Sequence, residues 1–228
     1  MIFVVIQSIF GAGLLIFGVP VLLLYGLDYL DIVGMLLPSS IAISMLQLFK
    51  HRNIKSTELK LLPLAILGIT IGLSLSIFNG NSNVISRIIG LSMLFASLLR
   101  SNSAVKKYTA SVLMKHRSIF HFANSIFHGF SNLGGILLTF YSASVYKDKI
   151  NSMCCTALYY LVYAASQTII LICIGKAVIF QSGLPFLPLT LALYLVVGQK
   201  TFGFISQHQF DNLATAFFFF AGAVFLCS

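Results

Sequence analysis

Charged residues are scarce in this chain, and acidic ones are the scarcest. Of its 228 residues only 8% are charged, while 58% are hydrophobic. Soluble domains carry about 25% charged residues. The five Asp and Glu residues all lie at the ends of apolar segments or in the links between them. This composition excludes a separate soluble domain and indicates an integral membrane protein that is surrounded by lipid.

Cysteine is also sparse, and no metal-binding spacing accompanies it. The four cysteines lie in apolar segments, without a C-x-x-C or Cys/His pattern: Cys154, Cys155, Cys173 and Cys227. The H-E-x-x-H motif of zinc proteases is absent as well. We therefore expect no metal and no cofactor.

A serine enzyme is the form of catalysis that the residues leave open. Ser125 follows His121 by four positions, and Ser131 follows His128 by three, so either pair could lie on one helical face. No G-x-S-x-G elbow supports such a dyad. We expect a protein that is not an enzyme.

The 14 Lys and Arg residues give a formal net charge of +9. They are concentrated in short loops between apolar segments, as orientation signals are. This distribution argues against a nucleic-acid partner. It places the basic loops 50–60 and 100–117 in the cytoplasm. The N-terminus has neither the basic region nor the cleavage site of a signal peptide, so we expect it to form the first membrane segment.

The apolar pattern predicts an all-α polytopic membrane protein with about eight segments. Each has close to the length of about 20 residues that crosses the hydrocarbon core. The predicted segments are 2–26, 32–49, 61–78, 84–100, 118–144, 151–174, 186–204 and 210–227.

Segment one is predicted to break at Gly11, Gly13, Gly18 and Pro20, and segment five at Gly129, Gly134 and Gly135. The surroundings of the two breaks repeat. The shift that places Asn124 on Gln7 also places Gly135 on Gly18 and Asp148 on Asp31. A second shift places Leu187-Pro188-Leu189 on Leu62-Pro63-Leu64. We expect two membrane repeats, 1–100 and 118–228, joined by a basic cytoplasmic linker, 101–117.

The positive-inside rule gives a test of whether segments one and five cross the membrane. If all eight segments cross, Lys and Arg divide 10 to 4 between the two sides. If segments one and five are re-entrant hairpins, the division becomes 12 to 2. The rule favours hairpins. Each repeat then has three crossings, which makes the repeats inverted, a recurrent arrangement in transporters.

With these features placed, the chain resembles the sulfite exporter TauE/SafE family of membrane permeases along its whole length. The resemblance rests on the order of several motifs: Gly11-Ala12-Gly13, Gly18-Val19-Pro20, Gly26, Lys50-His51-Arg52-Asn53, Gly68, Gly72, His128-Gly129 and Asn132-Leu133-Gly134-Gly135. The first element has fewer glycines than is usual in the family, and the second has Leu137 where the first has Pro20. The resemblance implies a secondary transporter of small, often sulfur-containing anions in a bacterial inner membrane.

An anion site needs hydrogen-bond donors, positive helix ends and no buried carboxylate. The two interruptions offer such donors, and no predicted span contains an acid. The candidate substrate-binding residues are Gln7, Gly11, Gly13, Gly18, Ser39, Ser40, Asn124, His128, Ser131, Asn132, Gly134 and Gly135. Because no span offers an acid for a coupling cation, we expect export driven by the membrane potential.

Simpler interpretations of several of these residues also stay open. Gly68 and Gly72 could serve only the close approach of helices, and Ser39 and Ser40 could bond their own backbone. His128 could bind the anion, relay a proton or be a neutral packed histidine. An anion channel, an uptake permease and a non-transporting scaffold also stay open, as does assembly into a homo-oligomer.

Overall fold

The computed structural model describes residues 4, 7, 13–51, 55–79, 82–146, 148–198, 200–201 and 206–227. Every regular element in these ranges is helical, which confirms the all-α prediction. The elements are α2 (Leu14–Leu24), α3 (Tyr29–His51), α4 (Ser56–Leu59), α5 (Leu62–Asn79), α6 (Ser82–Ser101), α7 (Ser103–Lys115), α8 (Arg117–Ser131), α9 (Gly135–Val145), α10 (Lys149–Cys173), α11 (Ala177–Gln181), η1 (Leu184–Phe186), α12 (Leu187–Leu193), η2 (Tyr194–Gly198) and α14 (Gln207–Cys227).

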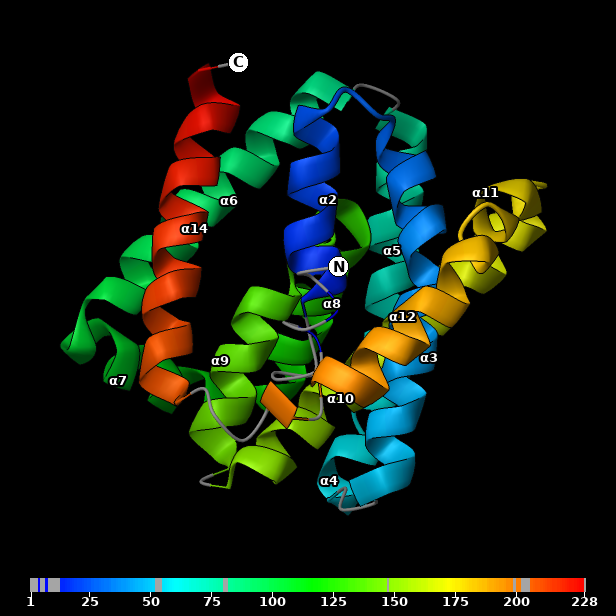
Figure 1. Cartoon of the computed structure of the whole chain (residues 1–228). Helices are drawn as coiled ribbons and strands as arrows, with labels where there is room; N and C mark the ends of the chain where they lie inside the picture. The colour runs from blue at the N-terminus through cyan, green and yellow to red at the C-terminus, as the bar shows by residue number, and fades with distance from the viewer. Residues whose placement is uncertain are drawn as a thin grey trace.

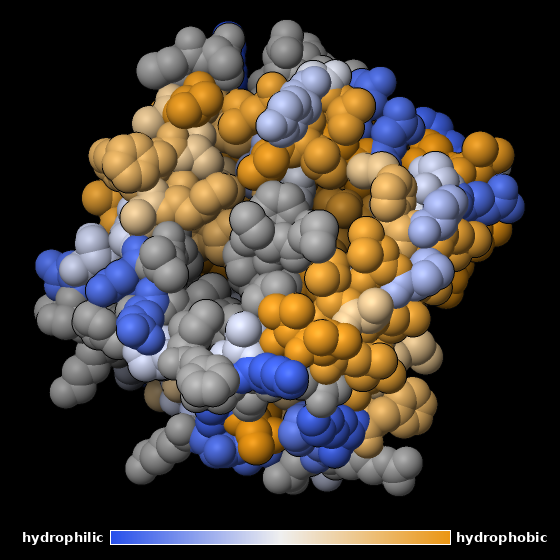
Figure 2. All heavy atoms as spheres, in the orientation of Figure 1, coloured by the Kyte–Doolittle hydropathy of each residue, from blue (hydrophilic) through white to orange (hydrophobic). Residues whose placement is uncertain are grey.

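The surface is that of a protein in lipid. Large apolar side chains are widely exposed, among them Phe78, Leu98 and Phe220. Figure 2 shows apolar residues across the upper part and the right-hand side of one face, with hydrophilic ones gathered at the left, the lower edge and the upper right. Among the described residues, three stretches are long and apolar enough to cross a bilayer: Tyr29–His51, Lys149–Cys173 and Ala177–Gly198. The arrangement in eight segments stays a prediction. Shorter apolar helices include α2 and α9.

Helices from the two halves of the chain pack in pairs. α3 lies against α10, α6 against α14, and α5 against α8 (Figure 1). A Cβ atom at Gly68 would lie 2.7 Å from the Phe122 carbonyl oxygen, and one at Gly72 would meet the backbone of Ile126. The interpretation of these glycines as close-packing residues is the one that the structure supports.

The segment around Gly134 folds into an antiparallel helical hairpin. α8 ends at Ser131, the backbone of Asn132 is left-handed (φ 58°), and α9 begins at Gly135. Tyr141 in α9 then lies 4.7 Å from His121 in α8, measured between ring centroids. In a continuous helix those residues would be about 30 Å apart. Each limb, at about 22 and 16 Å, is shorter than the hydrocarbon core of about 30 Å.

In the first glycine-rich segment, Gln7 and Leu14 lie close together. Gln7 Oε1 accepts a hydrogen bond from the Leu14 amide at 3.2 Å, which a continuous helix could not allow. Gly13 precedes α2 as its N-cap residue. The predicted break at Gly18 and Pro20 is wrong, because α2 runs through both residues. Apolar burial on all sides at this point supports an unbroken helix. Gly11 lies outside the described residues.

The basic linker is more structured than expected. Most of 101–117 forms α7. The basic and polar composition of this stretch did not predict that helix. In the loop 50–60, Ser56–Leu59 forms the single turn α4.

Candidate functional site

The tip of the α8–α9 hairpin presents unused backbone donors. Ile136 and Leu138 donate to the carbonyl groups of Leu133 and Gly134, at 3.0 Å each. Within the described part of the chain, the amide groups of Gly134 and Gly135 find no acceptor. These amides lie at the N-terminal, electropositive end of α9. Backbone N–H groups in this position form a common protein site for anions.

Buried polar side chains without partners surround the same tip. The Tyr160 hydroxyl from α10 contacts Gly135 so closely that a Cβ atom there would overlap it. The hydroxyl, both ring nitrogens of His128 and Oδ1 of Asn124 are buried and have no hydrogen-bond partner among the described residues. Gly134 packs against His128 and the Asn124 carbonyl. Buried polar atoms are nearly always satisfied, so their concentration here indicates that a polar ligand or water belongs beside them.

Other polar side chains hold the tip in its shape. The Asn132 side-chain amide donates to the Tyr29 hydroxyl at 2.6 Å, and the Gln167 amide donates to Asn132 Oδ1 at 3.2 Å. Ser131 Oγ donates to the Phe127 carbonyl and accepts from the Leu133 amide. Asn132 and Ser131, both predicted as binding residues, therefore fix the turn.

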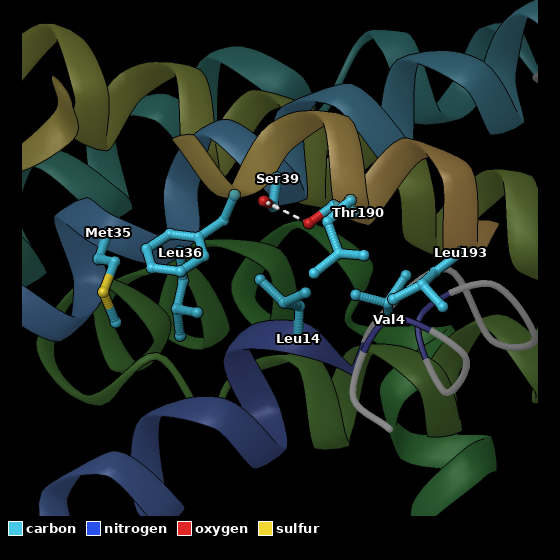
Figure 3. A pocket seen from close by; sticks show the side chains of 9 residues that line it. Val4, Leu14, Met35, Leu36, Ser39, Thr190 and Leu193 are labelled. Atoms are coloured by element: carbon cyan, nitrogen blue, oxygen red, sulfur yellow. Dashed lines mark hydrogen bonds between the residues drawn. The ribbon is translucent and has the colours of Figure 1, made fainter. Parts of the chain in front are cut away.

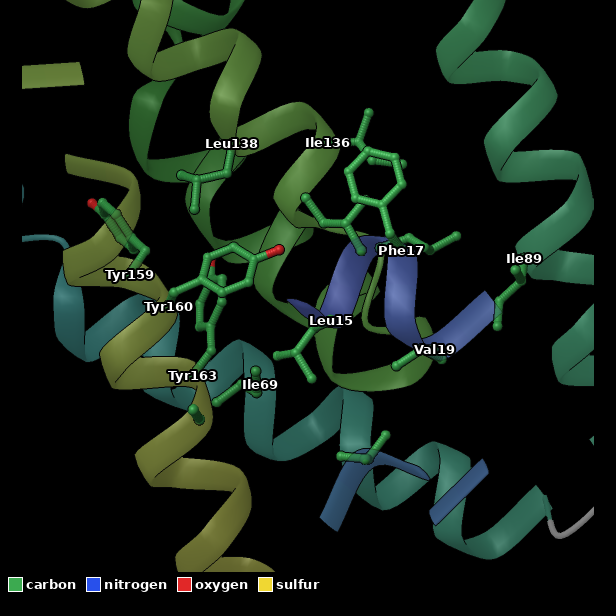
Figure 4. Packing of buried hydrophobic residues seen from close by; sticks show 14 of the residues in the cluster. Leu15, Phe17, Val19, Ile69, Ile89, Ile136, Leu138, Tyr159, Tyr160 and Tyr163 are labelled. Atoms are coloured by element: carbon green, nitrogen blue, oxygen red, sulfur yellow. The ribbon is translucent and has the colours of Figure 1, made fainter. Parts of the chain in front are cut away.

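The first segment meets this tip with its apolar side. Ile16, in the first turn of α2, lies against Gly135, and Figure 4 shows Leu15, Phe17, Ile136 and Tyr160 converging. Gln7 is fully engaged: it caps Leu14, and its Nε2 lies 3.3 Å from the Ser40 carbonyl and 3.5 Å from Ser40 Oγ. Gly13 and Gly18 are buried in the backbone of this segment. The two segments come together, but their roles differ.

Ser39 lies apart from the tip. Its hydroxyl is 3.0 Å from that of Thr190 in α12, at the edge of a cavity of about 170 Å³ (Figure 3). The cavity is otherwise lined by apolar side chains, among them Val4, Leu14 and Leu193. Because the hydroxyls of Ser39 and Thr190 bond to one another, this cavity offers an anion few hydrogen-bond donors.

A carboxylate was missed by the sequence-based reasoning. Glu58 in α4, expected in a polar loop, is completely buried. It accepts hydrogen bonds from the hydroxyls of Tyr159 at 2.9 Å and Tyr141 at 3.3 Å. Its Oε2 lies 3.6 Å from Nε2 of His121, which is buried too. The expectation that no carboxylate is buried is therefore wrong, because long-range packing covers this loop.

Neither of the two serine–histidine dyads that the spacing leaves possible is formed. Ser125 Oγ bonds to the backbone of His121 and to the Tyr163 hydroxyl. Ser131 Oγ bonds to backbone groups, and the His128 ring stacks on Tyr163 at 4.5 Å without a hydrogen bond to serine.

An all-helical chain with an apolar surface, whose helix is interrupted among buried polar groups, has the build of a membrane transporter. The chain belongs to the sulfite exporter TauE/SafE family, because the family model with that description matches residues 1–225. Members of this family are membrane transporters of the sulfite or sulfonate type. Searches of curated proteins and of solved structures found no match.

Proposed function

We propose that the chain is a secondary transporter that exports small anions, sulfite or sulfonates, and binds them at the tip of the α8–α9 hairpin. The observations that carry this proposal are the amides of Gly134 and Gly135, which have no acceptor among the described residues, and the unpartnered Tyr160 hydroxyl, which packs against Gly135. Three donors thus lie at one turn, at the positive end of a helix. A sulfonate has three oxygens that can accept from such donors.

The helix pairing supports the transport mechanism. α3 with α10 and α6 with α14 pair equivalent helices of the two predicted repeats, as a two-fold axis between inverted repeats would require. We infer that α8–α9 is re-entrant, and that access alternates as one repeat tilts against the other. The protein would thus be a multi-pass protein of a bacterial inner membrane.

The direction rests on the membrane potential. A monoanion that leaves a cell with a negative interior gains about 2.3 kcal/mol per 100 mV. The second argument for export, the absence of a buried acid, is lost with the burial of Glu58. Uptake coupled to a cation is therefore a second candidate, and the Glu58–His121 pair is the observation that favours it.

The test is anion flux in proteoliposomes with the Tyr160→Phe variant. This change removes one oxygen atom and keeps the ring. A hydrogen bond to a charged group contributes about 1.5–3 kcal/mol, so we expect flux at low substrate concentration to fall about tenfold or more. Radiolabelled sulfite or methanesulfonate supplies the measurement.

Tyr25→Phe is the matched control, because Tyr25 is 79% exposed at the end of α2. It should leave flux unchanged. Equal flux in wild type and Tyr160→Phe would remove the tip as the binding site. Absence of any anion flux in folded wild-type protein would refute the transporter proposal itself.

A further inference from the structure

Glu58 connects the first half of the chain to three helices of the second. Its carboxylate contacts His121 of α8, Tyr141 of α9 and Tyr159 of α10, and all four side chains are fully buried. The His121 and Tyr159 rings stack at 4.3 Å, and the Tyr159 hydroxyl lies 3.3 Å from His121 Nε2. An acid and a base thus lie in contact inside the protein.

The remaining ionisable groups around this pair come from each neighbouring element. Lys55, before α4, lies 4.4 Å above the ring of Tyr146, which ends α9. Cys155 of α10 interacts electrostatically with Glu58, and Arg117 of α8 does so with His121. Lys55 and Arg117 are exposed. Their charges are therefore largely screened by solvent.

The charge of the pair depends on one proton. With that proton, either as a neutral acid beside a neutral histidine or as an ion pair, the net charge is zero. Without it, a buried negative charge remains, which is strongly unfavourable. The geometry is suited to binding a single proton that Glu58 and His121 share.

A chain of contacts along α8 joins this pair to the hairpin tip. Ser125 bonds both the His121 backbone and the Tyr163 hydroxyl, and His128 stacks on Tyr163. Because the hairpin folds back, the tip amides lie beside Asn124 and His128, within two turns of His121. Two turns correspond to a separation of about 10 Å.

We propose that the Glu58–His121 pair is a proton-binding site whose occupancy is linked to anion binding at the hairpin tip. The inference rests on the proposed function for the identity of the anion. A negative pair repels the anion, and a protonated pair does not. Linkage is reciprocal, so an anion that binds also raises proton affinity. For unit charges about 10 Å apart at an effective dielectric constant of about 20, the effect is on the order of tenfold.

The experiment measures binding of methanesulfonate, which stays ionised throughout, to protein in lipid nanodiscs. Affinity is followed from mildly acidic to mildly alkaline pH, and proton uptake is followed with an indicator dye in weak buffer. Wild type should take up a proton on binding and should bind about tenfold more weakly at alkaline pH. Glu58→Gln keeps the size of the side chain and accepts one of the two tyrosine bonds, while its amide nitrogen can donate to the other hydroxyl. It should lose both effects.

Asp28→Asn is the control, because Asp28 is an exposed acid in the link before α3. It should behave as wild type. His121→Asn provides a second variant and should also lose the pH dependence. Unchanged pH dependence in Glu58→Gln, or none in wild type, would overturn the inference.

Infrared difference spectroscopy separates the two proposals. A carbonyl band of a protonated carboxyl should titrate in wild type and be missing in Glu58→Gln, with no anion present. If wild type binds no anion, the proposed function fails, and the linkage fails with it. The infrared band then still decides whether Glu58 takes up the proton, and its absence would overturn the proton site.

Discussion

The helices α2 and α9, which follow the two glycine-rich segments, differ in the partners of their first amides. At α2, the Leu14 amide is capped by Gln7, a residue of the same segment. At α9, the amides of Gly134 and Gly135 have no acceptor in the described chain, and the unpartnered Tyr160 hydroxyl packs against Gly135. The start of α2 is thus satisfied within the protein, whereas the start of α9 has donors for the anion that we propose to bind there. If the two segments are copies of one predicted repeat, only one copy has kept donors for a ligand.

The largest expected effect is a loss of stability at Gly72 in α5, the helix that packs against α8. Gly72→Val would drive a side chain into the Ile126 backbone of α8. We expect a loss of about 3 kcal/mol or more, since rigid backbone cannot move aside. Thermal unfolding in detergent measures it. Ile71→Val, on the exposed side of α5, is the control and should change stability by less than about 0.5 kcal/mol.

The position that corresponds to Gly72 in the predicted second repeat sharpens the comparison between the two halves. The shift that aligns the two Leu-Pro-Leu motifs places Val197 on Gly72 and Leu193 on Gly68. The predicted counterpart of α5 therefore lacks the two glycines with which α5 packs closely against α8. If Gly72→Val is as stable as wild type, glycine is not needed for the close packing of α5 against α8. The sequence difference between α5 and its predicted counterpart would then have no effect on stability.

A middle-sized effect is expected at the turn of the second hairpin. Asn132→Ala loses the hydrogen bonds to Tyr29 and Gln167. It also replaces asparagine, which tolerates a left-handed backbone, with alanine, which tolerates it less well. We expect a loss of about 2–3 kcal/mol in unfolding free energy. Asn132→Gly should recover about 1 kcal/mol of it, because glycine accepts that backbone without strain. Equal stability of Asn132→Ala and Asn132→Gly would show that the left-handed backbone at residue 132 adds nothing to the loss in unfolding free energy.

The smallest effect is expected at the first segment. Gln7→Ala removes a cap from α2 and should destabilise the protein by about 1 kcal/mol. Anion affinity should stay within twofold of wild type, the opposite of Tyr160→Phe. Binding of radiolabelled methanesulfonate, measured beside the unfolding temperature, checks both. A tenfold loss of affinity in Gln7→Ala would mean that both segments bind the anion.

The sequence allowed prediction of the helical class and of where the second segment breaks, because apolar runs and glycine are local signals. It also indicated Asn124, His128, Gly134 and Gly135, which the structure brings together. The break expected at Gly18 was wrong because proline and glycine are tolerated in a helix that neighbours enclose. The two-repeat arrangement stays a prediction.

Glu58 and the tyrosines could not be assigned in this way. A glutamate in a loop rich in lysine reads as exposed, and only packing by α8, α9 and α10 buries it. Tyr160, Tyr163 and Gln167 follow one another at helical spacing in an apolar segment. That spacing was the available signal for a polar face on α10.

The crowding of tyrosine around the hairpin also has an optical consequence. The chain has nine tyrosines and no tryptophan. Six of the nine, Tyr29, Tyr141, Tyr146, Tyr159, Tyr160 and Tyr163, are buried around the tip and Glu58. Near-ultraviolet absorbance and emission of the unlabelled protein therefore arise mostly from this one region. The molecule contains its own spectroscopic reporter, and the proposed binding of an anion at the tip can be tested without attaching a dye.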